Sequence, residues 1–322
     1  MTNNDAVMRV VNPGMLTIPV DQGRSGTHCV GLTSGGAMDQ VSFHLANRLC
    51  GNAPGTTCFE ITYGGLEVDV LDTCKIAVTG AEMPVSVNQK MMPRWQTLLL
   101  NQGDRLQIGQ ASKGIRGYLA IAGGFQVQQQ FGSSSAIPRE FLGGTHQNGS
   151  GVKPEEILFR ESRKESSQEG PVLRVSESDI PDFPEHVTLR VVPGYQIESF
   201  ERVDLVRFFS SDYCVTQRMD RMGVRLQGKA ISSNLAAMRS EGIAYGAIQV
   251  PPDGQPIIML NDRQTIGGYP KVGSVVSQDC AKLSQLRQGD SVNFEPITVS
   301  EADNLYHLNL SRLTNIQLIK CD

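Results

Sequence analysis

Residues 246–271, GAIQVPPDGQPIIMLNDRQTIGGYPK, contain the pattern that decides the fold. Two short, mostly apolar runs, 247–250 and 257–260, flank the sequence PPDG at 251–254. An Asp-Gly pair after proline is a strong turn signal, so the two runs predict a β-hairpin. The second run is apolar at four consecutive positions, which is typical of a strand buried on both faces.

The second run ends in a dense polar cluster, NDRQT at 261–265, followed by Gly267, Gly268 and Pro270. These glycines and the proline predict a tightly turned backbone. A buried strand that delivers polar side chains onto such a turn is one way to build a binding site. A plain polar connection is an equal alternative at this point.

The composition indicates a globular, β-rich chain. The 322 residues are 39% hydrophobic and 19% charged, and 33 of them are glycine without a repeat period. The length suits two domains of about 100–200 residues each. The formal net charge is −4 and no basic patch stands out, so we expect no nucleic-acid partner.

The cysteines and the apolar runs indicate a cytoplasmic protein. Seven cysteines occur without a Cys-x-x-Cys pair, which favours reduced thiols. The first residues, MTNNDA, lack the basic and apolar regions of a signal peptide. No apolar run approaches the roughly 18 residues that span a bilayer, so we expect no membrane partner.

Strand patterns in both halves predict two β domains. Between residues 58 and 124, short apolar runs recur about every ten residues, as in a barrel or sandwich. Residues 161–185 are polar and charged, which is typical of a linker. A second β-rich unit starts at Val187. The expected domains are therefore 1–175 and 186–322.

One helix is predicted in the first half, starting after Asp39. Val41, Leu45 and Leu49 recur at a spacing of four, and Gly51 can end the helix. Asp39 suits the N-cap position. A cap and a site role can coexist, because the free amides of a helix N-terminus attract anions.

The polar residues that are candidates for a binding site, such as Asp39, Arg221 and Gln264, carry carboxylate, guanidinium and amide groups. This chemistry suits binding of a small polar amide or carboxylate and stabilisation of an oxyanion, and it does not suit a Ser-His-Asp hydrolase. The five histidines are scattered, so no metal site is expected. Arg221 and Arg225 lie near Asp220, either as a structural ion pair or as an anion clamp. The loop GSSS at 132–135 could cradle a carboxylate or phosphate, or be a plain turn.

Several motifs resemble one known family. These are GGAMD at 35–39 with ANRLCGN at 46–52 and Glu60, then DRMGVRLQG at 220–228, then residues 246–271. From about residue 8 to 295, the chain resembles the allophanate hydrolase subunit 2 family, also called the biotin-dependent carboxyltransferase or KipA family. The chain departs from the usual family pattern at three positions. The family usually has glutamine at the position of Val20, serine at that of Met219 and arginine at that of Ser134.

The resemblance implies a mainly β fold of two cyclophilin-like β-barrel domains with a few short helices and a cleft between the domains. It implies a hydrolase component, the C subunit of an ATP-dependent 5-oxoprolinase that opens 5-oxoproline to glutamate. The expected partners are the B subunit, which is related to allophanate hydrolase subunit 1, and the A subunit. The complex uses ATP, and no cofactor is expected on this chain.

The alternatives are a biotin-dependent carboxyltransferase of the urea carboxylase type and a non-catalytic antagonist of a kinase inhibitor. Biotin belongs only to the first alternative.

The resemblance also suggests roles for particular residues. The expected catalytic residues are Asp262, Arg263 and Asp39. The expected substrate-binding residues are Arg221, Arg225, Gln264, Glu60, Asn47 and Tyr269. No metal ligand is expected.

Overall fold

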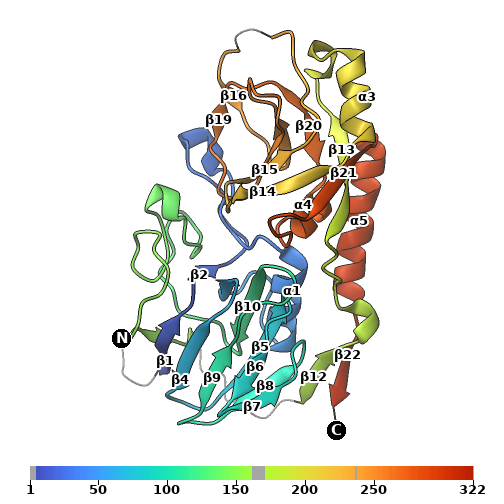
Figure 1. Ribbon diagram of the computed structural model, residues 1–322. Coiled ribbons are helices and arrows are strands. Elements are labelled where there is room, and N and C mark those ends of the chain that lie inside the picture. Colours follow the sequence, from blue (N-terminus) through green and yellow to red (C-terminus); the bar gives the residue numbers. More distant parts are fainter. Residues whose placement is uncertain (1–4, 162–170, 236–237, 322) are drawn as a thin grey trace. The chain divides into compact units, whose positions relative to one another are not determined.

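The computed structural model describes residues 5–161, 171–235 and 238–321 (Figure 1). The chain divides into two compact units. Unit 1 comprises Met1–Ser25, Gly35–Asp182 and Asn315–Asp322, and unit 2 comprises Gly26–Ser34 and Phe183–Thr314. The division at residues 182 and 183 lies within the predicted linker, part of which falls outside the described residues.

Two segments depart from a simple division into residues 1–175 and 186–322. The C-terminal strand β22 (Leu318–Cys321) pairs with β12 (Val172–Val175), which ties the chain end to unit 1. Residues 26–34 group with unit 2, and His28 among them contacts Arg263. Both departures arise from pairings between residues far apart in sequence, which local patterns do not encode.

The mainly β prediction is confirmed, and unit 1 is built from two sheets. Within the described residues, the first sheet has the order β11 (Ile157–Phe159), β1 (Ala6–Pro13), β4 (Leu66–Val70), β9 (Arg105–Ile108), β6 (Val85–Val87), β7 (Lys90–Met92). The second has the order β2 (Leu16–Val20), β3 (Cys58–Thr62), β10 (Arg116–Ile121), β5 (Cys74–Gly80), β8 (Thr97–Leu100). Apolar side chains from both sheets form one buried cluster, as expected for sheets packed face to face.

The predicted helix of unit 1 is α1 (Gln40–Leu49), and it packs on β5 and β10 (Figure 1). It begins after Asp39, as predicted. Gly51 follows the helix with φ 68°, a conformation that glycine adopts without steric cost. Phe43 and Leu45 on the helix are buried. Apolar spacing and a cap were enough to place this helix.

Unit 2 contains a closed barrel. The strands of the barrel follow the order β13 (His186–Pro193), β20 (Lys271–Val275), β17 (Ala247–Gln249), β18 (Ile257–Met259), β15 (Gly223–Gln227), β14 (Tyr213–Met219), β21 (Ser291–Pro296). β17 and β18 are antiparallel neighbours, so the predicted hairpin at 247–260 is confirmed. β13 and β21 pair in parallel and close the barrel. A separate short ribbon joins β16 (Glu241–Gly242) to β19 (Ile266–Gly267).

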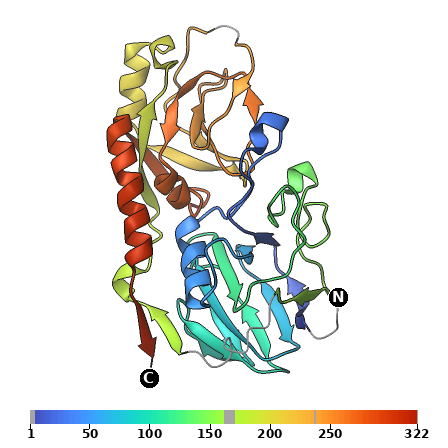
Figure 2. The same cartoon turned by 180° about the vertical axis from the view of Figure 1, so that it is seen from behind.

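Unit 2 also contains the helices α3 (Arg202–Ser210) and α4 (Ser277–Leu283) and most of α5 (Val299–Asn315). α4 packs on β13 of the barrel. α3, the yellow helix in Figure 2, lies against β21. The rings of Phe208 on α3 and Phe294 on β21 stack with centroids 4.2 Å apart. Among the residues that the structure describes, no helix combines the length and apolarity needed to cross a membrane.

Candidate functional site

In unit 2, the polar cluster that follows the hairpin begins with a buried ion pair. Arg221 donates to Asp262 through Nε to Oδ2 at 2.8 Å and through Nη2 to Oδ1 at 3.0 Å. The side chains are only 7% and 3% exposed. The Asp262 backbone N–H also donates to the Arg221 carbonyl at 2.9 Å. This bidentate pair therefore fixes the start of the polar segment to the loop before β15.

Arg263 is also held inside unit 2. Its Nε donates to the Ile243 carbonyl at 3.0 Å, and its Nη1 donates to the Leu260 carbonyl at 3.2 Å. Its Nη2 lies 3.3 Å from His28 Nε2. A guanidinium has no acceptor, so His28 Nε2 must accept in this contact. Burial lowers the pKa of Arg263, and the Tyr245 ring lies 5.7 Å from its guanidinium carbon.

Arg221 and Arg225 were expected either to form structural ion pairs or to clamp an anion, and their contacts in the structure are ion pairs. Arg225 pairs with Asp253 of the hairpin turn. Asp220 instead accepts the backbone N–H of Met222 at 2.7 Å and shapes the turn between β14 and β15. Both predicted arginines are therefore engaged in ion pairs within unit 2.

Gln264 and Tyr269 differ from these engaged residues. Gln264 is half-buried, and Tyr269 is 44% exposed. Across the described part of the chain, neither side chain makes a hydrogen bond or an ion pair. Of the residues predicted in unit 2, these two keep side-chain donors and acceptors for a ligand.

In unit 1, the predicted residues belong to internal hydrogen-bond networks. The interpretation of Asp39 as an N-cap is confirmed: its Oδ1 accepts from Val41 N and Ser42 N, each at 3.1 Å. Asn47 donates to the Thr56 carbonyl at 2.9 Å and is 1% exposed. Both residues hold local structure.

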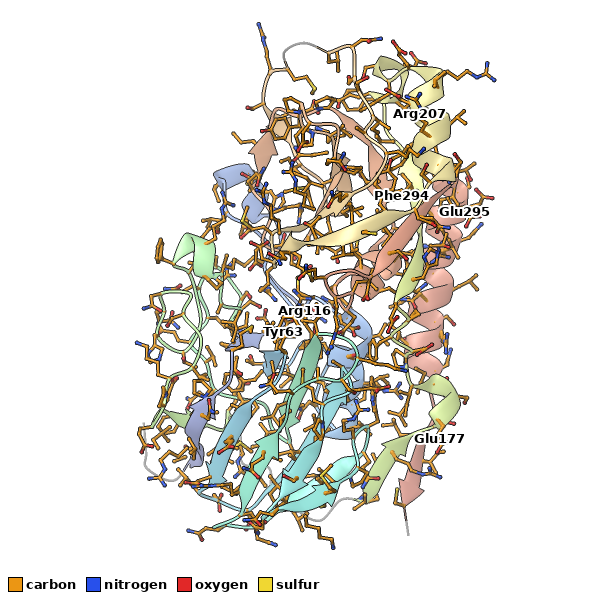
Figure 3. All side chains as sticks on the ribbon, in the orientation of Figure 1. Tyr63, Arg116, Glu177, Arg207, Phe294 and Glu295 are labelled. Atoms are coloured by element: carbon orange, nitrogen blue, oxygen red, sulfur yellow. The ribbon has the colours of Figure 1, made fainter. Side chains whose placement is uncertain are left out.

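Glu60 is fully buried on β3. It accepts from Met38 N at 2.9 Å and from the Tyr118 hydroxyl at 2.8 Å. Arg116, labelled in Figure 3 on β10, approaches Glu60 Oε1 with its Nε at 3.6 Å. Burial, together with the neighbouring charge of Glu60, raises the pKa of Tyr118, so the hydroxyl stays a donor.

The glycine–serine loop does cradle a carboxylate, and that carboxylate is Asp21 of the same chain. Ser133 Oγ and Ser135 Oγ each donate to Asp21 Oδ1 at 2.6 Å. Ser134 donates its backbone N–H at 2.7 Å and its hydroxyl at 3.1 Å to Asp21 Oδ2. These groups are almost completely buried. The serine loop thus closes a structural network of unit 1.

The sequence reasoning missed His28 and Ser34. His28 Nε2 lies 3.2 Å from Ser34 Oγ, beside its contact with Arg263. More than two hundred positions separate His28 from Arg263, so no local pattern could have joined them. Within the described ranges, no group of three or more His, Cys, Asp or Glu side chains is arranged to hold a metal ion.

The fold and these polar centres define a two-unit β protein whose candidate binding groups are amide, hydroxyl, guanidinium and carboxylate side chains. The chain belongs to the family described as carboxyltransferase domain, subdomain A and B, whose model matches residues 30–296. The resemblance predicted from the sequence motifs is thereby confirmed.

Relatives and solved structures agree with this membership. The chain is 31% identical over 300 residues to the 5-oxoprolinase C subunit of Haemophilus influenzae, covering 93% of this chain and 94% of the relative. It is 30% identical over 298 residues to the 5-oxoprolinase C subunit of Escherichia coli, covering 92% and 93%. The crystal structure of Kluyveromyces lactis urea carboxylase matches with a TM-score of 0.90 and 26% identity. That match covers 99% of this chain and only 30% of the larger chain.

Proposed function

We propose that this chain is the C subunit of an ATP-dependent 5-oxoprolinase, acting with the A and B subunits to open 5-oxoproline to glutamate. The observation that carries the proposal is the match to two relatives of that name over more than nine-tenths of each length. A match that spans both chains nearly end to end is what a component with the same role would give. The proposed hydrolytic activity belongs to the assembled complex, in the cytoplasm.

Within this proposal, Gln264 and Tyr269 contact a small polar amide or carboxylate substrate. Their side chains have donors and acceptors to offer, because they make no polar contact within the described chain. The polar atoms of Asp262 and Arg263 are engaged inside unit 2, where they hold the segment before Gln264 and Tyr269 in place. A direct catalytic role for Asp262, Arg263 or Asp39 remains a prediction, as does substrate binding by Arg221, Arg225, Glu60 and Asn47.

The test is reconstitution. The chain is co-expressed with candidate A and B subunits, and ATP-dependent formation of glutamate from 5-oxoproline is measured. We expect activity only when all three proteins are present. A well-folded complex without activity would overturn the proposal.

A matched pair of tyrosine variants tests the site. Tyr269→Ala is expected to raise KM for 5-oxoproline, because it removes a substrate contact. Tyr306→Ala, at a tyrosine of similar exposure on α5, is the control and should leave KM unchanged. Equal effects of the two substitutions would remove Tyr269 from the proposed site.

A second candidate function is carboxyl transfer from carboxybiotin to a urea-like substrate. It is favoured by the match of nearly the whole chain to one part of Kluyveromyces lactis urea carboxylase. The test supplies a biotin carboxylase and a biotin carrier together with the chain and its B subunit, and measures carboxylation of urea. Urea carboxylation without 5-oxoproline opening would replace the first proposal with the second.

A further inference from the structure

Unit 2 contains a groove over the paired strands β14 and β15 of the barrel (Figure 1). Its volume is about 670 Å³. Ligand pockets typically measure about 300–1,000 Å³, so the groove has room for a small organic molecule. It shares only Arg225 with the polar centres described above.

β14 and β15 form the floor of this groove. Val215 and Leu226 pair across the two strands, and both are buried. Successive side chains of a strand point to opposite faces, so the neighbours of this buried pair point outward. Cys214 and Gln227 are the next pair along the ladder, and both are exposed and line the groove. The groove therefore lies on the outer face of the barrel.

Two turns form the walls. On one side, the Gly289 backbone N–H donates to the Val215 carbonyl at 2.9 Å, which holds the turn before β21 against β14. On the other side, Gln255 Oε1 accepts the Gly228 backbone N–H at 2.8 Å, and Gln255 Nε2 donates to the Gly228 carbonyl at 3.3 Å. Gly289 and Gln255 both line the groove. Because both walls are hydrogen-bonded to the strands, the shape of the groove is set by the barrel.

Two arginines supply positive charge to the lining. The Arg225 side chain is 22% exposed, and its Nη2 donates to Asp253. This contact fixes the guanidinium and leaves most of its five N–H groups available. Arg218 is exposed, and its guanidinium makes no hydrogen bond or ion pair with the part of the chain that the structure describes. Among the described residues that line the groove, none is aspartate or glutamate.

Three side-chain amides accompany the arginines. Gln217, Gln227 and Gln288 are exposed and line the groove. Their amides make no hydrogen bond within the described residues. An amide can donate and accept, as a hydroxyl group does, whereas a guanidinium can only donate. The lining thus combines two donors for an anion with three groups that suit hydroxyls.

We propose that this groove binds a small organic phosphate, with the phosphate between Arg218 and Arg225 and the hydroxyl groups of the ligand on the glutamines. A phosphate monoester carries nearly two negative charges at neutral pH and three strong acceptor oxygens, enough for two guanidinium groups. A carboxylate has two oxygens, which one guanidinium can satisfy. The proposal concerns binding by this chain alone and does not depend on the proposed function.

The experiment is isothermal titration calorimetry on the full chain in a phosphate-free buffer, with three probes. These are glycerol 3-phosphate, inorganic phosphate, and succinate, which has a similar charge divided between separate carboxylates. We expect saturable binding of glycerol 3-phosphate, weaker binding of inorganic phosphate, which lacks the glycerol hydroxyls, and roughly tenfold weaker binding of succinate, from loss of one charge-assisted hydrogen bond. Absence of glycerol 3-phosphate binding, or equal binding of either other probe, would overturn the proposal.

A matched pair of arginine variants locates the phosphate. Arg218→Gln should weaken binding of glycerol 3-phosphate roughly tenfold and leave the melting temperature unchanged, because this side chain has no contact to lose within the described chain. Arg202→Gln removes another exposed arginine, on α3 and outside the groove, and should leave binding unchanged. If Arg218→Gln binds glycerol 3-phosphate as well as the original chain does, the proposed site is wrong.

Arg225→Lys tests the geometry of the second guanidinium. Lysine keeps a positive charge beside Asp253 but lacks the planar fork that binds two phosphate oxygens at once. We expect the variant to stay folded in thermal unfolding and to bind glycerol 3-phosphate roughly tenfold more weakly. Unchanged affinity would exclude Arg225 from phosphate recognition and overturn the proposed arrangement.

The exposed thiol of Cys214 reports whether the groove is occupied. The chain is labelled with N-ethylmaleimide, and mass spectrometry of the peptides follows each cysteine. Saturating glycerol 3-phosphate should slow labelling of Cys214, which lines the groove, and leave labelling of Cys29 unchanged, since this exposed cysteine lies outside it. Equal labelling of Cys214 with and without the bound phosphate would place the ligand elsewhere.

Discussion

Asp21 in unit 1 and Glu241 in unit 2 are carboxylates that each gather several donors, in opposite settings. Asp21 is 6% exposed, and hydroxyl and backbone groups of residues 133–135 surround it at 2.6–3.1 Å. The Glu241 side chain is 31% exposed, and its donors Lys271, Tyr195 and Gln196 line a pocket. The first network is complete without a ligand, whereas the second opens onto space for one.

The difference shows how the same type of group can serve structure or binding. A buried carboxylate with all of its donors in place rigidifies the chain around it, because breaking any bond leaves a buried group unpaired. A carboxylate at a pocket can exchange a protein donor for a ligand donor without leaving a hydrogen-bonding group unpaired, because the released donor can bind water. The polar groups most suited to ligand contact are therefore the partly exposed ones, not the most buried ones.

The largest loss of unfolding free energy is expected for Asp262→Ala. This variant tests whether a carboxylate is structural because it is buried, whichever unit it lies in. Asp262 lies in unit 2 but is as buried as Asp21. Its loss leaves the Arg221 charge buried without its carboxylate, which costs about 3–5 kcal/mol of unfolding free energy. Urea denaturation measures this.

The control for Asp262→Ala removes both charges at once. The double variant Arg221→Met with Asp262→Leu should regain most of the lost stability, since an apolar pair can replace a buried ion pair. A loss of less than about 1 kcal/mol for Asp262→Ala would contradict a buried pair, because that is the range of exposed pairs.

The next largest effect is expected for Asp21→Ala. The substitution leaves the hydroxyls of Ser133 and Ser135 and the amide of Ser134 without their acceptor. An unpaired buried group costs at least about 1 kcal/mol, so the three groups together give an expected loss of about 3 kcal/mol at this lower bound, measured by urea denaturation. Gln129→Ala, at an exposed position before the same loop, is the control. Similar losses in the two variants would show that the network is not structural.

A smaller effect is expected for Asp39→Ala, because the partners of this carboxylate are mostly local. The cap bonds to Val41 N and Ser42 N are lost, which costs about 1–2 kcal/mol. Asp39→Ser keeps a capping oxygen and should retain most of the stability in thermal unfolding. If Asp39→Ser is as damaging as Asp39→Ala, capping does not explain the residue.

The smallest effect on stability is expected for Glu241→Gln. Lys271 lowers the pKa of Glu241 in the folded chain, so its contribution is present above the unfolded pKa. That contribution disappears as pH falls through the folded pKa. The stability difference between the original chain and Glu241→Gln should therefore shrink on acidification, and also with added salt, as for an exposed pair. A difference that is constant from neutral to acidic pH would rule out this ion pair as its source.

Much of the fold could be predicted because the signals are local. The hairpin at 247–260 followed from two apolar runs and the turn PPDG, and α1 followed from apolar spacing and the Asp39 cap. The family motifs in the same segments indicated the carboxyltransferase domain family. These features depend on neighbours within a few residues, so the sequence alone determined them.

The tertiary structure alone decided which polar side chains meet. Asp21 reaches serines more than a hundred positions away, and Glu241 gathers Tyr195, Gln196 and Lys271 from separate segments. It also decided that Asp262 and Arg263 are engaged inside unit 2 while Gln264 and Tyr269 keep their side chains for other contacts. The physical reason is that strand pairing and packing set these distances, and both act between residues that are remote in sequence.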